Sequence, residues 1–464
     1  MEKAFTFFLS TLFLLMASSV MTQTNITTDQ LALLSLKSQI ISDPFRFLDK
    51  SWSPVRSVCQ WIGVTCGSRR QRVKSLNLSN MALTGKIPRE FGNLSFLVSL
   101  DLRSNNFHGH LPQEMAHLHR LKFLDLSFNN FIGEVPSWFG FLHQLQLLNF
   151  GNNSFIGSIL LHFLICPHLI LQVCSCCINY FTTVISYNSL QGNIPEEIGN
   201  LYNLNRLSIQ YNQLTGSIPF TIFNISRIEI VSFTGNSLSG YLPNGLCNGL
   251  PILKGLYLSR NKLHGHISTS LSDCSQLQEL FLSENDFIGE IPKEISNLIE
   301  LEVLNIEINR FSVPLPMEIF NISGLRIIGI SFNNLSGILP PNMGSILPNI
   351  ESIYLINLTN LVGTIPHSLS NCSKLKIVEL SHNKLTGLIP NSLGDLTHLQ
   401  YLNLGDNNLT SDSSLSFLTS LTNCRNLKLL SLSYNILNGM LPAAMGNLST
   451  SLRKFYFKNC TIKG

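Results

Sequence analysis

The sequence predicts an α/β solenoid, a chain coiled many times around one continuous core with a parallel sheet along one side. Two observations lead to this fold class. A unit of the form LxxLxLxxNxLxGxIP recurs about every 24 residues after Arg72, and only 12% of the 464 residues are charged. That charge content is low for an ordinary globular surface. Because repeat architectures grow along one axis, length alone does not indicate several domains here.

Each position of the unit has a physical reason. The two leucines of LxL face inward from a short strand, because alternate residues of a strand share a face. One unit cannot bury them, whereas stacked units can. The asparagine amide can satisfy backbone groups where the chain turns inward. Glycine permits the following turn, and proline fixes φ where the chain leaves the sheet. Four clear copies are LVSLDLRSNNFHGHLP, LKFLDLSFNNFIGEVP, LNRLSIQYNQLTGSIP and LQELFLSENDFIGEIP.

The asparagine position defines the register of the solenoid. Met81 occupies it in the first unit, and the unit around Leu358 and Thr359 lacks the asparagine and carries one extra residue. The spacing predicts about fifteen units over residues 72–464, plus a partial sixteenth with Cys460 in this position. The asparagines are Asn105, Asn129, Asn153, Asn188, Asn212, Asn236, Asn261, Asn285, Asn309, Asn333, Asn383, Asn407 and Asn435.

The first residues are typical of a secretory signal peptide. Lys3 precedes an almost wholly apolar run from Phe5 to Met16, and small residues follow. We expect residues 1–22 to be removed near Thr22; the alternative, an uncleaved anchor helix, is disfavoured because the run is short for a bilayer. Behind such a signal, several Asn-X-Ser/Thr sites should carry glycans. The sites are Asn25, Asn77, Asn93, Asn152, Asn224, Asn321, Asn334, Asn357, Asn371, Asn408, Asn447 and Asn459.

The eleven cysteines leave at least one without an intramolecular partner. Cys59 and Cys66 stand apart in a short polar and aromatic stretch, and we expect them to form a disulfide in an oxidising compartment. Cys274, Cys372 and Cys424 recur in one apolar position of the repeat. We therefore predict that these three are core thiols and not bridges.

An irregular segment interrupts the repeat at residues 160–185. The asparagine register jumps 35 residues from Asn153 to Asn188, and the intervening run is apolar and rich in cysteine. We interpret it as a degenerate repeat with an inserted loop, derived from a misread intron, and as the least ordered part of the solenoid. A membrane span and a metal site are weaker alternatives. The potential ligands of that metal site would be Cys174, Cys176, Cys177, His162 and His168.

At this point the chain resembles a known family. The GxIP signature resembles the plant-specific class of leucine-rich repeats. The segments DQLALLSLKSQIISDP, SW at Ser51 and Trp52, and CQWIGVTC resemble the N-terminal cap of plant receptor-like kinases. The segments SFLTSLTNCRNLKLLSLSYN and LPAAMGNLSTSLRKFYFKNCTIKG resemble the subfamily of flagellin-sensing and elongation-factor-sensing immune receptors.

The resemblance implies an α/β leucine-rich-repeat solenoid that forms a curved right-handed superhelix, with the parallel β-sheet on the concave face and an N-terminal helical cap over residues 25–71. It implies a peptide or protein ligand, a possible co-receptor kinase with leucine-rich repeats, and a membrane-anchored full-length form. The chain stops at Gly464 inside a repeat, with no kinase motif. We expect a truncated receptor ectodomain or a truncated gene model, located outside the cell or on the outer face of the plasma membrane.

The variable positions around the inner leucines predict the binding surface. They point out from the sheet, and exposed aromatic and arginine side chains are common interface anchors. Tyr211, Tyr257, Arg260 and Phe281 form the most favoured local group, and the alternative is that these positions are simply solvated. A glycan on Asn77 would project from the same face. The candidates are Asp101, Arg103, Asp125, Phe128, Gln210, Tyr211, Tyr257, Arg260, Phe281, Glu284, Asn305 and Glu307, followed in later units by Glu379, His382, Asp406 and Tyr434.

The sequence therefore favours an extracellular ligand-recognition ectodomain in defence or developmental signalling. The alternative is a free secreted binder, such as an inhibitor of a pathogen's cell-wall-degrading enzyme. An enzyme is disfavoured, because no nucleophile elbow, paired-carboxylate motif, HExxH or phosphate loop is present. We expect no cofactor and no metal. A net charge of +4 without a long run of Lys or Arg argues against a nucleic-acid-binding surface.

Overall fold

The computed structural model describes residues 25–159 and 185–463. It divides into two compact units, residues 1–155 and 156–464, which are taken separately below. The predicted signal peptide and nearly all of the irregular segment 160–185 lie outside the described residues. In both units every regular coil supplies an LxL strand, a second strand after the asparagine position, and a short 3-10 helix on the return path.

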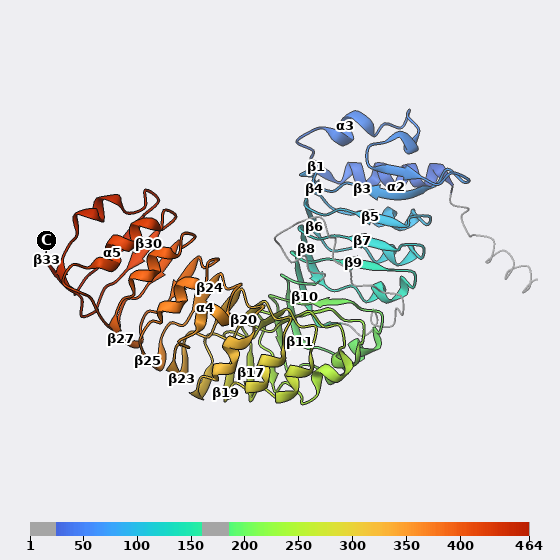
Figure 1. Cartoon of the computed structure of the whole chain (residues 1–464). Coiled ribbons are helices and arrows are strands. Elements are labelled where there is room, and N and C mark those ends of the chain that lie inside the picture. The colour runs from blue at the N-terminus through green and yellow to red at the C-terminus, as the bar shows by residue number, and fades with distance from the viewer. Residues whose placement is uncertain (1–24, 160–184, 464) are drawn as a thin grey trace, which may run out of the picture. The chain divides into compact units, whose positions relative to one another are not determined.

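The first unit begins with the cap (Figure 1). Two cap strands pair antiparallel with the first repeat: β2 with β3, placing Val64 opposite Leu76, and β1 with β4, placing Ile40 opposite Gly85. They cover the edges that the first coil would otherwise leave open. The cap elements are α2 (Ile26–Ser38), β1 (Ile40–Ser42), α3 (Phe47–Ser51), η1 (Val58–Gln60) and β2 (Val64–Cys66).

Buried polar and aromatic contacts hold the cap to the first coil. The carboxylate of Asp29, which is fully buried, accepts hydrogen bonds from the Arg72 guanidinium at 2.6 and 2.8 Å and from the backbone of Val73 at 2.9 Å. The rings of Trp52 and Trp61 stack 5.3 Å apart. The expected disulfide between Cys59 and Cys66 is present, with Cα atoms 5.4 Å apart.

The LxL strands of the first unit form a parallel, in-register sheet behind β2. The leucines at its centre, Leu76, Leu100, Leu124 and Leu148, are at most 1% exposed. The LxL strands are β3 (Val73–Asn77), β5 (Ser99–Asp101), β7 (Phe123–Asp125) and β9 (Leu147–Asn149). The second strands are β4 (Thr84–Gly85), β6 (Asn106–Gly109), β8 (Asn130–Glu134) and, running into the next unit, β10 (Ser154–Gly157). The 3-10 helices are η2 (Arg89–Asn93), η3 (Gln113–His117) and η4 (Ser137–Phe141).

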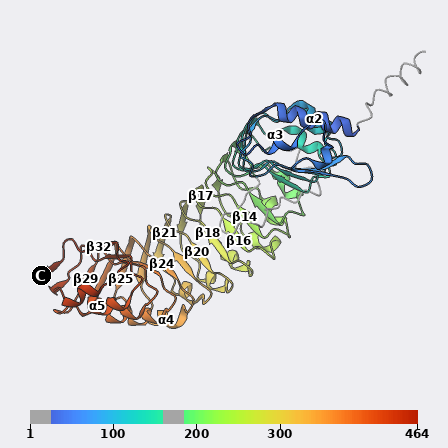
Figure 2. The same cartoon turned by 90° about the horizontal axis from the view of Figure 1, so that it is seen from above.

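The second unit repeats this plan over an 11-stranded LxL sheet, parallel throughout (Figure 2). These strands are β12 (Arg206–Ser208), β14 (Ile230–Ser232), β16 (Gly255–Tyr257), β18 (Glu279–Phe281), β20 (Val303–Asn305), β22 (Ile327–Gly329), β24 (Ser352–Tyr354), β26 (Ile377–Glu379), β28 (Tyr401–Asn403), β30 (Leu429–Ser431) and β32 (Lys454–Tyr456). The predicted solenoid with parallel sheets is thus confirmed.

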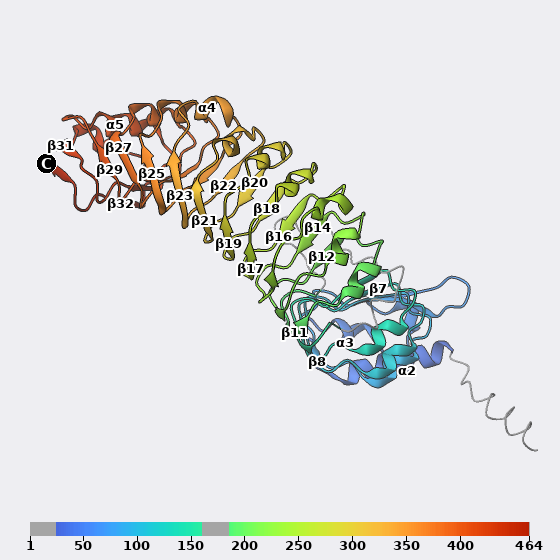
Figure 3. The ribbon, with the colours of Figure 1, turned by 90° about the horizontal axis from the view of Figure 1, so that it is seen from below.

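The second strands of this unit lie side by side as further parallel ladders (Figure 3). They are β11 (Ser189–Asn193), β13 (Gln213–Thr215), β15 (Ser239–Gly240), β17 (Lys262–Gly265), β19 (Asp286–Gly289), β21 (Arg310–Pro314), β23 (Asn333–Ile338), β25 (Leu358–Gly363), β27 (Lys384–Leu388), β29 (Asn408–Thr410), β31 (Asn438–Met440) and β33 (Thr461–Lys463). The helices are η6 (Glu196–Asn200), η7 (Phe220–Asn224), η8 (Leu246–Gly249), η9 (Thr269–Asp273), η10 (Lys293–Asn297), η11 (Met317–Asn321), α4 (Met343–Ile346), η12 (His367–Asn371), η13 (Asn391–Asp395), α5 (Ser416–Ser420), η14 (Leu421–Asn423) and η15 (Ala443–Asn447).

The asparagine ladder joins each coil to the one before it. Asn309 is typical: its amide donates to the Leu282 carbonyl of the preceding coil at 3.0 Å, and its oxygen accepts the Phe287 N–H at 3.1 Å. Twelve of the predicted ladder asparagines make the same backward donation in the described residues. In the last coil Cys460 occupies the ladder position in place of asparagine, and its thiol lies 3.3 Å from the Leu432 carbonyl of the preceding coil.

The cysteine prediction is correct for two residues and wrong for one. Cys372 and Cys424 are buried free thiols, and burial raises the pKa of each to about 11. Cys274, which we expected to be a core thiol, forms a disulfide with Cys247. Stacking explains the difference: a residue 27 positions earlier lies in the preceding coil, and the two Cα atoms are 5.1 Å apart. The repeat position alone did not show that a second cysteine occupied the neighbouring coil.

Within the described residues, none of the helices combines the length and the apolar character that crossing a bilayer requires.

Candidate functional site

The open face of the LxL sheet is the surface that the repeat leaves variable. Both leucines of LxL point into the core, so the residues on either side of each strand's central leucine face outward. The two positions between the second leucine and the ladder asparagine, such as Gln210 and Tyr211 before Asn212, lie on the same face. The position directly before the ladder asparagine adopts a left-handed backbone in nearly every coil, for example at Tyr211 (φ 50°) and Arg260 (φ 58°). We call the residues in this position the turn row. Their side chains are directed by a fixed turn and not by a flexible loop.

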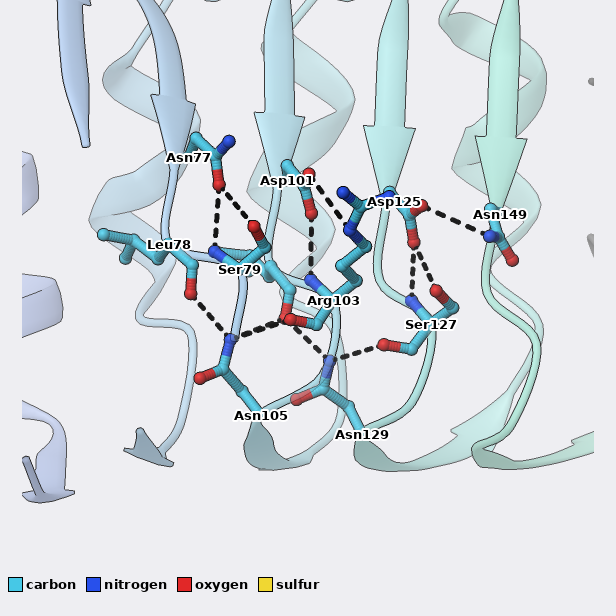
Figure 4. A network of polar contacts seen from close by, with 11 residues as sticks. Asn77, Leu78, Ser79, Asp101, Arg103, Asn105, Asp125, Ser127, Asn129 and Asn149 are labelled. Carbon is cyan, nitrogen blue, oxygen red and sulfur yellow. Dashed lines mark hydrogen bonds and ion pairs between the residues drawn. The ribbon is translucent and has the colours of Figure 1, made fainter. Parts of the chain in front are cut away.

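In the first unit the open face carries an acidic pair (Figure 4). Asp101 accepts a hydrogen bond from the Arg103 backbone at 3.1 Å and lies 3.5 Å from its guanidinium. Burial raises the pKa of Asp101, and the nearby charge of Asp125 raises it further. Asp125 accepts from the Ser127 backbone and hydroxyl at 3.0 and 2.6 Å, and from the Asn149 amide at 3.2 Å.

These contacts correct the expectation for Asp125. Its side chain points to the open face, but only 8% of the residue is exposed, because the neighbouring polar groups cover it. Phe128, in the turn row, is the opposite case and is 46% exposed. Phe123, beside the central leucine of β7, is 42% exposed as well. The first unit therefore offers two exposed rings beside polar groups that largely satisfy one another.

In the second unit the turn row forms a continuous strip. The rings of Tyr187 and Tyr211 stack 4.6 Å apart. The next position is Gly235, where an added Cβ would lie 2.6 Å from the Tyr211 ring, so the absent side chain makes room for that ring. Arg260 follows, and its Nε donates to Glu284 at 2.8 Å. Glu284, and more weakly Tyr211, raise the pKa of the Arg260 guanidinium.

A second group lies on the strands beside this strip. The rings of Tyr257 and Phe281 stack 5.2 Å apart, and the Tyr257 hydroxyl donates to Glu279 at 2.5 Å. Burial and this hydrogen bond raise the pKa of Tyr257. Tyr257 is only 8% exposed, so it is not the exposed anchor that we predicted. It supports Phe281, which remains half-buried and accessible.

Further along the sheet, two partly buried carboxylates flank a tyrosine. Burial raises the pKa of Glu307 and of Glu379, and both charges act on Tyr354 between them. Gly329 makes room for Glu307, because a Cβ there would lie 3.0 Å from its carboxyl carbon. Ser331 is a hydrogen-bond partner of the Glu307 carboxylate. Glu307 and Glu379 therefore keep their protons to a higher pH than an exposed glutamate does.

The remaining candidates also lie on the open face, and most have polar partners. The Gln210 amide donates to the Ser208 hydroxyl at 3.1 Å, and the Asn305 oxygen accepts the Glu307 N–H at 3.2 Å. His382 pairs with Asp406 at 2.6 Å, and Tyr434 is 46% exposed.

Sequence reasoning missed Tyr187, Tyr354 and Gly235. Tyr187 directly precedes ladder residue Asn188 and was hidden by the irregular segment before it, and Tyr354 lies in the unit without a ladder asparagine. The register itself was the signal that could have found both. Gly235 bears no side chain, and its role follows only from the ring packed over it.

No group of three or more His, Cys, Asp or Glu side chains in the described residues is arranged to hold a metal ion. The cysteines and histidines of the weaker metal alternative lie between residues 160 and 184, outside the described residues.

Comparisons with known proteins agree with this geometry. The family profile "Leucine rich repeat" matches residues 70–131 and 355–409, with further repeat matches at 203–225, 276–298, 398–421 and 426–448. The "Leucine rich repeat N-terminal domain" profile matches residues 26–67. Among curated relatives, the LRR receptor-like serine/threonine-protein kinase EFR of Arabidopsis thaliana is 43% identical over 108 residues, which are 23% of this chain and 10% of that protein.

Two solved structures extend the likeness over most of the chain. A TDR receptor is 29% identical in sequence and superposes with a TM-score of 0.75; the match covers 83% of this chain and 64% of the receptor chain. The Arabidopsis receptor kinase HAESA, solved with the peptide hormone IDA and the co-receptor SERK1, is 27% identical with a TM-score of 0.68, covering 94% and 82%. The chain therefore belongs to the leucine-rich-repeat proteins, and its capped solenoid is similar to the ectodomains of plant receptor kinases.

Proposed function

We propose that this chain is the extracellular ligand-recognition ectodomain of a plant receptor-like kinase, acting in defence or developmental signalling, and that it binds a peptide or protein on the open face of the second unit. One observation carries the proposal: the strip of Tyr187, Tyr211, Arg260 and Glu284, held by left-handed turns and flanked by Phe281. Rings and guanidinium groups on a rigid sheet lose little entropy when they bind.

The domain organisation follows the same proposal. Residues 1–22 act as a signal peptide, residues 25–71 as the cap, and residues 72–464 as the repeats. The full-length receptor is anchored in the plasma membrane and engages a co-receptor kinase, as HAESA does in its complex with IDA and SERK1. The role that we propose for the chain is recognition, because the described open face presents rings and guanidinium groups suited to contact.

The test is a binding screen with the secreted, glycosylated protein against a library of synthetic plant and microbial peptides. The binding variant replaces Tyr211, Arg260 and Phe281 with alanine. A matched control removes the same three residue types from exposed positions on or just after the 3-10 helices, Tyr202, Arg227 and Phe220.

We expect the best peptide to lose affinity at least tenfold with the binding variant and to keep it with the control. If both variants bind equally well, the second unit's open face is not the site. If no peptide or secreted plant protein binds the wild-type chain, ligand recognition itself is refuted.

A further inference from the structure

A hollow of about 450 Å³ in the first unit is lined by five basic side chains. Arg69, Arg70 and Arg72 come from the segment between β2 and β3, Lys74 lies on β3, and Arg120 precedes β7 two coils later. The hollow lies at the ends where the LxL strands begin. None of its lining residues belongs to the open-face candidates described above.

Within the part of the chain that the structure describes, four of these cations have no acidic partner. Arg72 is neutralised by Asp29 at 2.6 Å, whereas Arg69, Arg70, Lys74 and Arg120 form no ion pair with any described residue. This is unlike the same edge of the second unit, where cations alternate with carboxylates. There Arg326 contacts Glu302 at 3.2 Å and Glu351 at 2.9 Å, Lys376 contacts Glu351 at 2.6 Å, and Lys254 contacts Glu229 at 2.9 Å. A concave wall of one charge sign concentrates the field and attracts anions.

Phe96 organises the cations around the hollow. The guanidinium carbons of Arg120, Arg72 and Arg70 lie 4.1, 4.4 and 5.5 Å from its ring centroid. Such cation–π contacts hold arginine side chains in place while leaving their N–H edges available for a bidentate oxyanion. Prior ordering of the side chains lowers the entropic cost of binding.

The arrangement selects among anionic ligands. The cations extend over two coil steps, about 10 Å at the usual strand spacing, which is too wide for one phosphate. Carboxylates two to three residues apart in an extended peptide span about 7–10 Å. A sugar polymer is a poorer fit, because guanidinium groups already cover the Phe96 ring and Ser68 is the single neutral polar side chain among the described lining residues.

We propose that this hollow binds an acidic segment of a peptide or protein through two or more Asp or Glu carboxylates. The site does not depend on the open face of the second unit, so either proposal can fail without the other.

The test uses fluorescence anisotropy with a labelled peptide of alternating Glu and Ser, and the same peptide with Gln in place of Glu as the neutral probe. The site variant combines R70Q, K74Q and R120Q. The charge-matched control combines K86Q, K293Q and K384Q, all at exposed lysines without an ion pair. Intrinsic tryptophan fluorescence, from Trp52 and Trp61 in the adjoining cap and from Trp138, reports whether the first unit of each variant is folded.

We expect the Glu peptide to bind the wild-type chain and the control alike, about tenfold more weakly to the site variant, and more weakly still at high salt. A charge-reversed variant, R70E, K74E and R120E, should instead bind a Lys-Ser peptide, which a folding defect could not produce. The proposal is overturned if site variant and control bind the Glu peptide equally. Tighter binding of trigalacturonate, inorganic phosphate or single-stranded DNA than of the Glu peptide would also overturn it.

Discussion

Replacing Asn309 with alanine should weaken the second unit at one identifiable junction between coils. The Asn309 side chain is 9% exposed and makes four hydrogen bonds to backbone groups. Its amide donates to the carbonyls of Leu282 at 3.0 Å, Ile306 at 3.1 Å and Glu307 at 3.1 Å. Its oxygen accepts the N–H of Phe287 at 3.1 Å. Alanine removes all four bonds without changing any leucine of the core.

The magnitude depends on which groups are left without a partner. The Leu282 carbonyl keeps the amide of Asn285 at 3.1 Å, and the Ile306 carbonyl keeps that of Asn333 at 3.1 Å. The buried Phe287 N–H keeps none, and an unsatisfied buried donor costs about 1–3 kcal/mol. Adding the weakened carbonyl contacts gives a total loss of about 3 kcal/mol in the free energy of unfolding.

Hydrogen exchange followed by mass spectrometry measures this loss locally, because a solenoid couples mainly to its nearest neighbours. We expect faster exchange in peptides containing Phe287 and Asn309 and unchanged exchange in the cap. Asn309→Cys should recover part of the protection, since Cys460 already occupies a ladder position. Asn297→Ala, at an exposed helix end, is the control. Equal exchange in Asn309→Ala and Asn297→Ala would refute the reasoning.

Three further predictions concern other parts of the chain. Replacing Cys247 and Cys274 together with serine opens a 27-residue loop and should cost about 3 kcal/mol; dithiothreitol should then lower the melting temperature of the wild type more than that of the variant, which keeps only the Cys59–Cys66 bridge, and an equal shift in both would contradict this. Glu307→Gln should remove a pH dependence: burial raises the folded pKa of Glu307, so the wild type should lose stability relative to the variant as pH rises from about 4.3 through the folded pKa, and parallel urea curves across that range would be the opposing result. Asp29→Asn strands the buried Arg72 charge and should cost about 3–5 kcal/mol, measured by tryptophan fluorescence, whereas replacing both partners with apolar residues should cost less.

The fold could be predicted because each repeat position has one physical task. The ladder asparagines fix the register, and that register correctly places Leu100, Leu124 and Leu256 in the core. The Cys247–Cys274 bridge could not be predicted in the same way. The bridge depends on which residue of one coil lies against Cys274 of the next. Cys247 lies in η8, whose spacing differs from that of the neighbouring helices, and a left-handed glycine, Gly245, precedes the first residue of η8.

The candidate surface was predictable in position but not in accessibility. The period shows that Tyr257 and Asp125 point to the open face, yet both are about as covered as core residues. Each is covered by a neighbour from an adjacent coil, Phe281 over Tyr257 and Asn149 beside Asp125. Such contacts depend on pairs of side chains one coil apart, and a pattern read along a single repeat does not contain them.

The glycosylation sites bear on which face is free to bind. Asn93, Asn224, Asn321, Asn371 and Asn447 each end a 3-10 helix on the return path, and all five are exposed. Glycans there would cover the helical side of their coils and leave the open face of the LxL sheet uncovered. Asn77 differs, because it ends β3 on the open face itself, and Asn152, Asn357 and Asn459 stand in the turn row of the same face. A glycan at Asn77 would confine binding to later coils, so Asn77→Gln should expose the start of the sheet in the first unit without changing affinity at the second unit.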